Sequence, residues 1–268
     1  MTVNVLKATG AKEQFDEEKL RASVKRAGIP ADIEDKVVKH VESKLYEAIP
    51  SQEVYRHVNE FLQREPHPSV IKYKLKQALM ELGPTGYPFE DFVTEILKSE
   101  GYLTQTRSIL MGQCVNHEID VIAQKNNEKL MVEAKYHNAP GIHTDVHVSL
   151  YTKARFDDLK EKHQLTKPWL FTNTKITPDA LAYALCVGMG VTSWSYPQNE
   201  SLRDLVEKYH LYPITLLTSL SEPQKQALLD NHIVLVKEIL QNEGCLDLLG
   251  IQVEKKEQII DEAKQISG

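Results

Sequence analysis

Residues 118–135 read EIDVIAQKNNEKLMVEAK, and this stretch decides how the whole chain is interpreted. Two short apolar segments flank a polar turn, a pattern typical of neighbouring strands. Because side chains alternate between the two faces of a strand, Glu133 and Lys135 project from the same face, about 7 Å apart along it. Asp120 can meet them from the other strand. The sequence therefore predicts two carboxylates and one ammonium group on one small patch.

Such a patch suits the hydrolysis of a phosphodiester. Two carboxylates, from Asp120 and Glu133, offer hard oxygen ligands to Mg²⁺ or Mn²⁺. Lys135 can orient or deprotonate the attacking water and stabilise developing charge. A surface strand with a salt bridge between Glu133 and Lys135 would show the same local pattern. The active-site interpretation is favoured by context, because Glu90 lies on a preceding predicted helix and Asp120 opens an apolar strand.

The surrounding chain predicts three regions. The breaker cluster GPTGYP separates residues 1–83, a short hairpin followed by helices, from the rest. In residues 84–200 helices alternate with apolar strands, which favours a mixed or parallel α/β sheet. Residues 201–268 read as helical. The expected helices lie at 16–27, 33–49, 51–64, 69–82, 88–100, 148–163 and 178–186, and the expected strands at 120–123, 130–133, 169–172 and 191–194.

The middle region resembles a known nuclease superfamily. The runs GYPFEDFVTEILKSEGY, HEIDVIA and KLMVEAK are similar to the PD-(D/E)XK nucleases, close to Mrr-type restriction endonucleases and archaeal Holliday junction resolvases. The resemblance implies that Asp120 and Glu133 are metal ligands, that Lys135 is the catalytic lysine and that Glu90 is a helix-borne acid completing the site. Mrr-type enzymes often have glutamine at the position of Glu133, so the motif departs toward the resolvase version.

Basic side chains and histidines follow the motif. Lys153 and Arg155 are expected on a helix near the site, where they would contact the DNA backbone or form a solvated basic face. His137, His143 and His147 are expected to be exposed loop histidines.

The first region resembles the ATP-cone, a nucleotide-sensing domain of ribonucleotide reductases and of a repressor of their genes. A hairpin with Lys7, then Phe-Asp opening a helix with Lys19, matches its pattern. The resemblance implies that Lys7 and Lys19 hold phosphates, and that Glu13, Ser51 and Tyr55 lie at the positions for base and sugar. Ala8 replaces the usual arginine, which removes a cation from the phosphate site. The alternative is a small domain of ordinary surface lysines that docks partners or dimerises.

Composition limits the class of protein. The content of 41% hydrophobic and 26% charged residues is that of a globular chain. No apolar run approaches the length that spans a bilayer, and the N-terminus lacks a signal-peptide pattern, so a cytoplasmic protein is expected. The net charge of −6 requires that any DNA contact use a local basic patch.

These features predict an α/β protein in three parts: a small, mostly helical ATP-cone domain (1–83), a restriction-endonuclease-like mixed sheet flanked by helices (84–200), and a helical tail (201–268). The expected function is a Mg²⁺- or Mn²⁺-dependent DNA endonuclease with ATP as a regulatory ligand, acting as a homodimer, as most such enzymes do. The alternative is a non-catalytic, nucleotide-responsive DNA-binding or scaffold protein.

Overall fold

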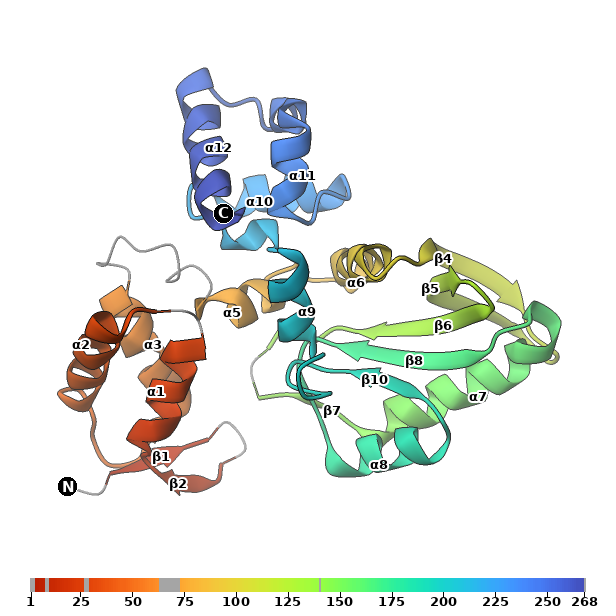
Figure 1. The fold of residues 1–268 in the computed structure, drawn as a ribbon, viewed down its shortest axis with the longest axis horizontal. Helices are drawn as coiled ribbons and strands as arrows, with labels where there is room; N and C mark the ends of the chain where they lie inside the picture. Colours follow the sequence, from red (N-terminus) through yellow and green to blue (C-terminus); the bar gives the residue numbers. More distant parts are fainter. Residues whose placement is uncertain (1–2, 8–9, 27–28, 63–72, 140, 268) are drawn as a thin grey trace. The chain divides into compact units, whose positions relative to one another are not determined.

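The computed structural model describes residues 3–7, 10–26, 29–62, 73–139 and 141–267. The chain forms two compact units, Met1–Leu75 and Lys76–Gly268 (Figure 1). In the described ranges, no helix combines the length and the apolar character needed to cross a membrane. The short helix α5 (Leu75–Met80) begins at the junction of the two units.

A small sheet and three helices make up the described part of the first unit. The strand order is β2-β1-β3, with β1 antiparallel to β2 and parallel to β3. Asp16 accepts a hydrogen bond from the backbone N–H of Lys19 and so caps the first helix, as expected. The helices bury an aliphatic core between them. The elements are β1 (Asn4–Leu6), β2 (Lys12–Gln14), α1 (Glu17–Arg26), α2 (Ala31–Glu42), β3 (Ile49–Pro50) and α3 (Ser51–Leu62).

One helix of this unit is shorter than expected. The helix predicted to run to Ile49 ends at Glu42, because Ile49 pairs with Val5 in the sheet and the chain must turn before reaching it. Ile49 is apolar because it is fully buried in this sheet. Its position also fits the helical spacing of the preceding apolar residues, and this fit is a coincidence. Ala8, Thr9 and the predicted helical residues 63–64 and 69–72 lie outside the described residues.

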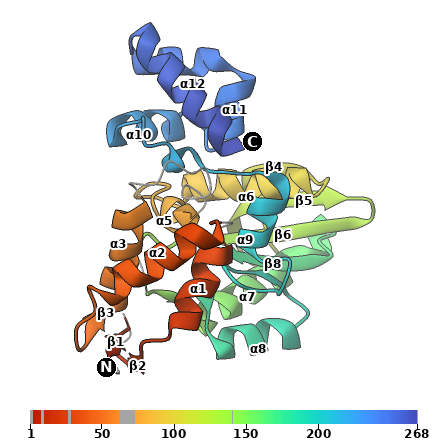
Figure 2. The ribbon, with the colours of Figure 1, turned by 60° about the vertical axis from the view of Figure 1, so that its left-hand side comes forward.

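The described part of the second unit is built on a five-stranded mixed sheet of order β10-β8-β6-β5-β4. Strands β4, β5 and β6 are antiparallel, whereas β6, β8 and β10 run parallel. Helices α7 and α8 cover one face and α6 lies against the other (Figures 1 and 2). The elements are α6 (Tyr87–Ser99), β4 (Leu103–Met111), β5 (Asn116–Lys125), β6 (Glu128–Lys135), β7 (His143–Thr144), α7 (Val146–His163), β8 (Lys167–Thr172), β9 (Lys175–Ile176), α8 (Pro178–Cys186) and β10 (Gly190–Thr192).

Strand β4 has no counterpart among the expected elements. Its apolar residues lie at its two ends and do not alternate with polar ones, and Leu103 and Ile109 are exposed at 81% and 73%. An edge strand with its apolar side chains in solvent gives the reverse of the usual burial signal, so its sequence pattern does not predict a strand. The two motif strands are also longer than predicted, because β5 extends by pairing with β4, and β6 extends by pairing with β5 and β8.

Apolar side chains of the sheet pack against α7 and α8. Met131 of β6 contacts Phe156 and Leu159 of α7 in one cluster. Leu170 of β8 packs with Ala184 of α8 in a second cluster. These contacts fix the face of β6 that looks toward α7.

The C-terminal residues are helical, as expected, and pack on α6 and the segment before it. Tyr209 and Lys208 both contact the Glu100 carboxylate, and Thr215 donates to the carbonyl oxygen of Ala78. Gly250 adopts a positive φ of 59° at the turn before the last helix, where a residue without a side chain is favoured. The elements are α9 (Leu202–Tyr209), η1 (Ile214–Leu216), α10 (Glu222–Asp230), α11 (Val236–Gln241), η2 (Glu243–Leu249) and α12 (Val253–Ser267).

Candidate functional site

Asp120 and Glu133 lie where two strands separate. The ladder between β5 and β6 ends at the pair Val121 and Val132. Beyond it, the Oδ2 atom of Asp120 accepts a hydrogen bond of 2.7 Å from the backbone N–H of Ala134. A side-chain carboxylate therefore takes the place of a backbone acceptor, and this contact holds Asp120 beside the strand that carries Glu133.

Glu133 is buried against α7 with an exposed fraction of 7%. It lies two residues from Met131 on the face that α7 covers. Its Oε2 atom accepts a hydrogen bond of 2.6 Å from Arg155, and its Oε1 atom accepts one from the hydroxyl of Tyr151. Tyr151 and Arg155 are four residues apart on α7, so they share one face of the helix. The Glu133 carboxylate thus contacts both a guanidinium cation and a hydroxyl donor.

Lys135 follows on the same face of β6 and is half-buried. Its charge lowers the pKa of His137, after the larger effect of burial. Among the described residues, the ion-pair partner of Glu133 is Arg155 and not Lys135. The surface salt bridge between Glu133 and Lys135, which would have explained the motif without an active site, is therefore not formed.

Glu90 approaches from the other side of the sheet. It lies in the first turn of α6, is 9% exposed, and forms an ion pair of 3.4 Å with Arg107 of β4. Arg107 has a positive φ of 49°, and the β4–β5 ladder skips it and Asp120. The pairing register is the same on both sides of this interruption, so neither strand holds an extra residue. The guanidinium of Arg107 reaches Glu90 from this position.

Arg107 is also the middle of a chain of charged groups. It contacts Asp91 at 2.7 Å, and the other oxygen of Asp91 lies 2.8 Å from Nδ1 of His232, just after α10. The C-terminal residues are thereby connected to Glu90 through three successive contacts, of His232 with Asp91, of Asp91 with Arg107 and of Arg107 with Glu90.

Two carboxylates of the site have a raised affinity for protons. Burial, followed by the charge of Glu133, raises the pKa of Asp120 to about 7. Burial, followed by the charge of Asp120, raises the pKa of Glu90 to about 7. Burial and the charge of Glu133 raise the pKa of Tyr151, which keeps its hydroxyl protonated as a donor. A bound cation would stabilise the charged form of these buried carboxylates.

Two expectations about the flanking residues need correction. His137 is not an exposed loop histidine: it is half-buried, and its Nε2 atom lies 3.1 Å from the hydroxyl of Thr144. His143 and His147 are exposed, as expected. Lys153 pairs with Asp157, whereas Arg155 faces the carboxylates, so this pair does not form one solvated basic face.

The candidate nucleotide residues gather at one end of the small sheet. Glu13 lies between Lys7, at 3.1 Å, and Lys19, with which it forms a shorter contact. These bonds, led by that from Lys19, lower the pKa of Glu13. Leu6 pairs with Pro50 in parallel strands, so the next residues, Lys7 and Ser51, emerge at the same edge. Tyr55 lies one helical turn after Ser51, with its ring stacked on Tyr73 at 5.2 Å.

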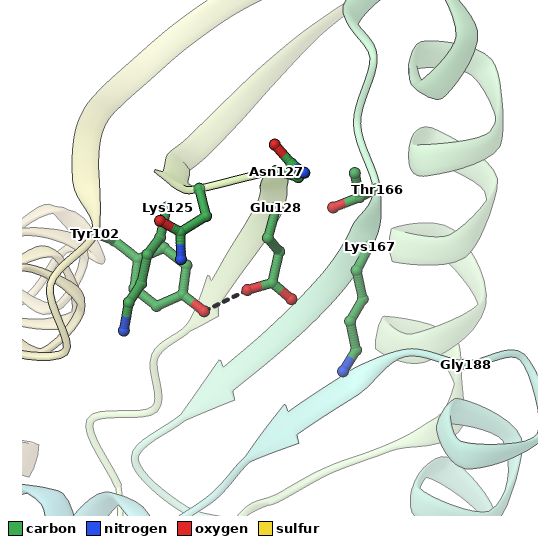
Figure 3. Close-up of a pocket in the computed structure, with 8 residues that line it drawn as sticks. Tyr102, Lys125, Asn127, Glu128, Thr166, Lys167 and Gly188 are labelled. Carbon is green, nitrogen blue, oxygen red and sulfur yellow. Dashed lines mark hydrogen bonds between the residues drawn. The ribbon is translucent and has the colours of Figure 1, made fainter.

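Two of the surface pockets formed by the described residues lie on the second unit. One is at the end of β6 away from Glu133, where the hydroxyl of Tyr102 donates to Glu128 across 2.5 Å (Figure 3). Its lining residues, Tyr102, Lys125, Asn126, Asn127, Glu128, Thr166, Lys167 and Gly188, include none of the candidate catalytic residues. The other is lined by Tyr151 and Arg155 together with the turn between β4 and β5. Only the second adjoins the carboxylates.

Sequence reasoning missed Tyr151 and Arg107 as residues of the site. The four-residue spacing of Tyr151 and Arg155 on a predicted helix was an available signal, since it places both on one face. No such signal existed for Arg107, because β4 itself was not predicted and the residue points inward through an irregular backbone conformation.

Comparison with known proteins agrees with this architecture. Family models described as an ATP cone domain, a restriction endonuclease and an AF1548-like C-terminal region match residues 3–76, 83–196 and 212–267. An uncharacterized protein of Archaeoglobus fulgidus is 39% identical over 177 residues, which is 66% of this chain and 100% of that protein. The crystal structure of AF1548, a protein of unknown function, has a TM-score of 0.61 at 38% identity and covers 69% of this chain and 99% of its own. The resemblances to ATP-cone domains and restriction endonucleases, and the mixed α/β fold, are confirmed.

Proposed function

Because this chain belongs to the AF1548-like family and joins an ATP-cone domain to a restriction-endonuclease-like domain, we propose that it is a metal-dependent DNA endonuclease regulated by a nucleotide. The observation that carries the proposal is the convergence of Glu90, Asp120 and Glu133 on one site, in which burial, followed by the charge of a neighbouring carboxylate, raises the pKa values of Asp120 and Glu90 to about 7. Structural ion pairs do not require this unfavourable arrangement, whereas a divalent cation would stabilise it.

The residues present fit Mg²⁺ or Mn²⁺. Asp120 and Glu133 would hold the ion through carboxylate oxygens, the ligands that these hard cations prefer, and Glu90 would complete the negative site. When bound, the ion would lower the pKa of a coordinated water and neutralise charge on a phosphate oxygen.

The remaining groups of the site have separate tasks. Lys135, half-buried beside Glu133, would orient the attacking water and offset negative charge on the phosphate. Arg155 holds Glu133 while its guanidinium also borders the adjoining pocket, where it can contact a phosphate group. Tyr151 donates to Glu133 and fixes the orientation of its carboxylate.

Regulation by a nucleotide is the second part of the proposal. Lys7 and Lys19 would bind phosphates, and Glu13, Ser51 and Tyr55 would bind base and sugar. Support comes from the position of the two lysines on either side of Glu13. ATP, as a polyanion, would compete with Glu13 for both lysines. We also propose that the three regions of the chain meet at residues 83 and 200, and that the protein acts on DNA as a homodimer.

The decisive experiment measures nicking of supercoiled plasmid with and without Mg²⁺ and ATP. We expect Asp120→Ala and Lys135→Ala each to lower the cleavage rate by about 10²- to 10⁴-fold, as removal of a positioned proton-transfer group or ligand does. Lys129→Ala, on the same strand, is the matched control and should cleave at the wild-type rate. Retained cleavage by both active-site variants, or metal binding without nicking under any condition, would overturn the proposal.

A further inference from the structure

A second group of metal-ligating side chains lies in the first unit. It consists of His40 in the last turn of α2 and His57 and Glu60 on α3. One potential ligand atom from each of the three lies within 4.8 Å of the others. His57 and Glu60 are three residues apart and share a face of their helix, so the group joins two neighbouring helices.

The geometry of the two imidazoles is well defined. His57 is 7% exposed, and its Nδ1 atom lies 2.9 Å from Oε2 of Glu60. The ring of His40 meets that of His57 nearly edge-on, with 6.4 Å between centroids and 74° between planes, and it packs on Phe61 at 5.4 Å. A nearly buried imidazole among a second imidazole and a carboxylate is the arrangement of a site for a transition metal.

Glu53 supplies an outer partner for this group. Its Oε1 atom lies 3.7 Å from Nε2 of His57, on the side of the ring opposite Glu60. If the Nδ1 atom of His57 binds a metal, the Nε2–H group points at this carboxylate. Metal-binding histidines commonly donate their second ring N–H in this way.

We propose that His40, His57 and Glu60 bind Zn²⁺, with the fourth ligand position open to water. Two imidazoles and one carboxylate suit Zn²⁺ and exclude Mg²⁺, which prefers oxygen ligands alone. Adjacent ligand atoms of a tetrahedral zinc site are about 3.3 Å apart at Zn–N distances near 2.0 Å, so small rotations of the side chains close the site. The ion would fasten α2 to α3, the helix that also begins with Ser51.

The test uses the full-length chain carrying Asp120→Asn, which weakens the proposed catalytic metal site. Zn²⁺ binding is measured by competition with a chromogenic chelator, and Co²⁺ is added separately as a spectroscopic substitute. We expect one equivalent of Zn²⁺ and the strong visible bands of a tetrahedral Co²⁺ complex. Glu60→Gln and His40→Gln should each weaken Zn²⁺ binding by more than the roughly 10- to 100-fold that loss of an outer partner costs.

Two further variants sharpen the result. Glu53→Gln should weaken binding by about 10-fold or more, as an outer partner, whereas Glu42→Gln removes an exposed carboxylate of α2 near His40 and should leave binding unchanged. Circular dichroism verifies that each variant is folded. Equal Zn²⁺ affinity in wild type, Glu60→Gln and His40→Gln, or the absence of tetrahedral Co²⁺ bands, would overturn the assignment.

Discussion

The two candidate sites shift the pKa of a carboxylate in opposite directions. In the first unit, Glu13 lies between Lys7 and Lys19, and these bonds lower its pKa. In the second unit, Asp120 lies beside another carboxylate in a partly buried position, and its pKa rises to about 7. One site is already neutralised by cations of the protein. In the other, the pKa values of Asp120 and Glu90 stay raised even though Arg107 and Arg155 lie in the site.

This difference indicates which kind of ligand each site binds. A site of buried carboxylates with raised pKa values gains free energy by binding a cation, because the ion offsets both repulsion and desolvation. A site in which lysines share one carboxylate gains by exchanging that carboxylate for a more highly charged anion. The nuclease-like site should therefore depend on a metal ion, and the N-terminal site on a polyanion.

The largest difference between the two sites is expected when one glutamate in each is replaced by glutamine. Glu133→Gln should lower plasmid cleavage by about 10²- to 10³-fold, since a charged group of the site is lost, and should lower the pKa of Asp120 toward its ordinary value. Glu13→Gln should leave cleavage without nucleotide unchanged. Rates from gel-based nicking assays and carboxyl titration by NMR provide the measurement. Similar rates for both variants would show that the sites do not differ as described.

Removing Arg155 tests how much the protein's own cations stabilise the buried charge of Glu133. Arg155→Ala leaves Glu133 buried without its ion pair, so the free energy of unfolding should fall by about 1.5–3 kcal/mol without metal. Mg²⁺ should restore more stability to this variant than to the wild type. Urea denaturation with EDTA or Mg²⁺ measures both effects. Lys153→Ala, which breaks the more exposed pair with Asp157, is the control and should cost under about 1 kcal/mol.

The raised pKa values predict a pH dependence of stability. In the unfolded chain Asp120 and Glu90 lose their protons near pH 4, whereas the folded chain retains them to about pH 7. Between these values the folded state binds more protons, so these groups lower stability as pH rises, by up to about 1.4 kcal/mol per pH unit for each proton. Urea denaturation in EDTA should show a smaller decrease for Asp120→Asn than for wild type. Parallel curves for the two proteins would contradict the assigned pKa.

The smallest expected effect concerns the nucleotide. Lys19→Ala should weaken ATP binding about three- to tenfold, because Lys19 is exposed and its bond to a phosphate is partly screened by water. Basal cleavage should not change. Isothermal titration calorimetry measures the affinity, and Lys25→Ala, an exposed lysine of the same helix, is the matched control. If both lysine variants bind ATP as wild type does, the phosphate role of Lys19 is wrong.

Local sequence patterns predicted much of this molecule for a physical reason. The motif strands could be located because short apolar segments flank a polar turn, and the apolar run of β6 is buried in the structure. Helix α8 was predicted with its observed bounds, because Thr177 and Pro178 define its start through a side-chain cap and a fixed φ.

The parts that could not be predicted depend on contacts distant in sequence. The end of α2 is set by the pairing of Ile49 with β1, and β4 exposes the apolar residues that normally indicate a buried face. Tyr151 and Arg107 enter the site through the packing of α7 and an unusual backbone angle. Similarly, His40 and His57 belong to separate helices, so their proximity follows only from the way α2 packs on α3.

The ion pairs that lead from His232 through Asp91 and Arg107 to Glu90 have a consequence for how this protein can evolve. A residue near the C-terminus helps to set the electrostatic environment of an acid more than a hundred positions earlier in the chain. Recombination that replaced the last helices with those of a distant relative would leave Asp91 without its imidazole and alter the position of Arg107. The tail and the nuclease-like sheet should therefore be inherited together.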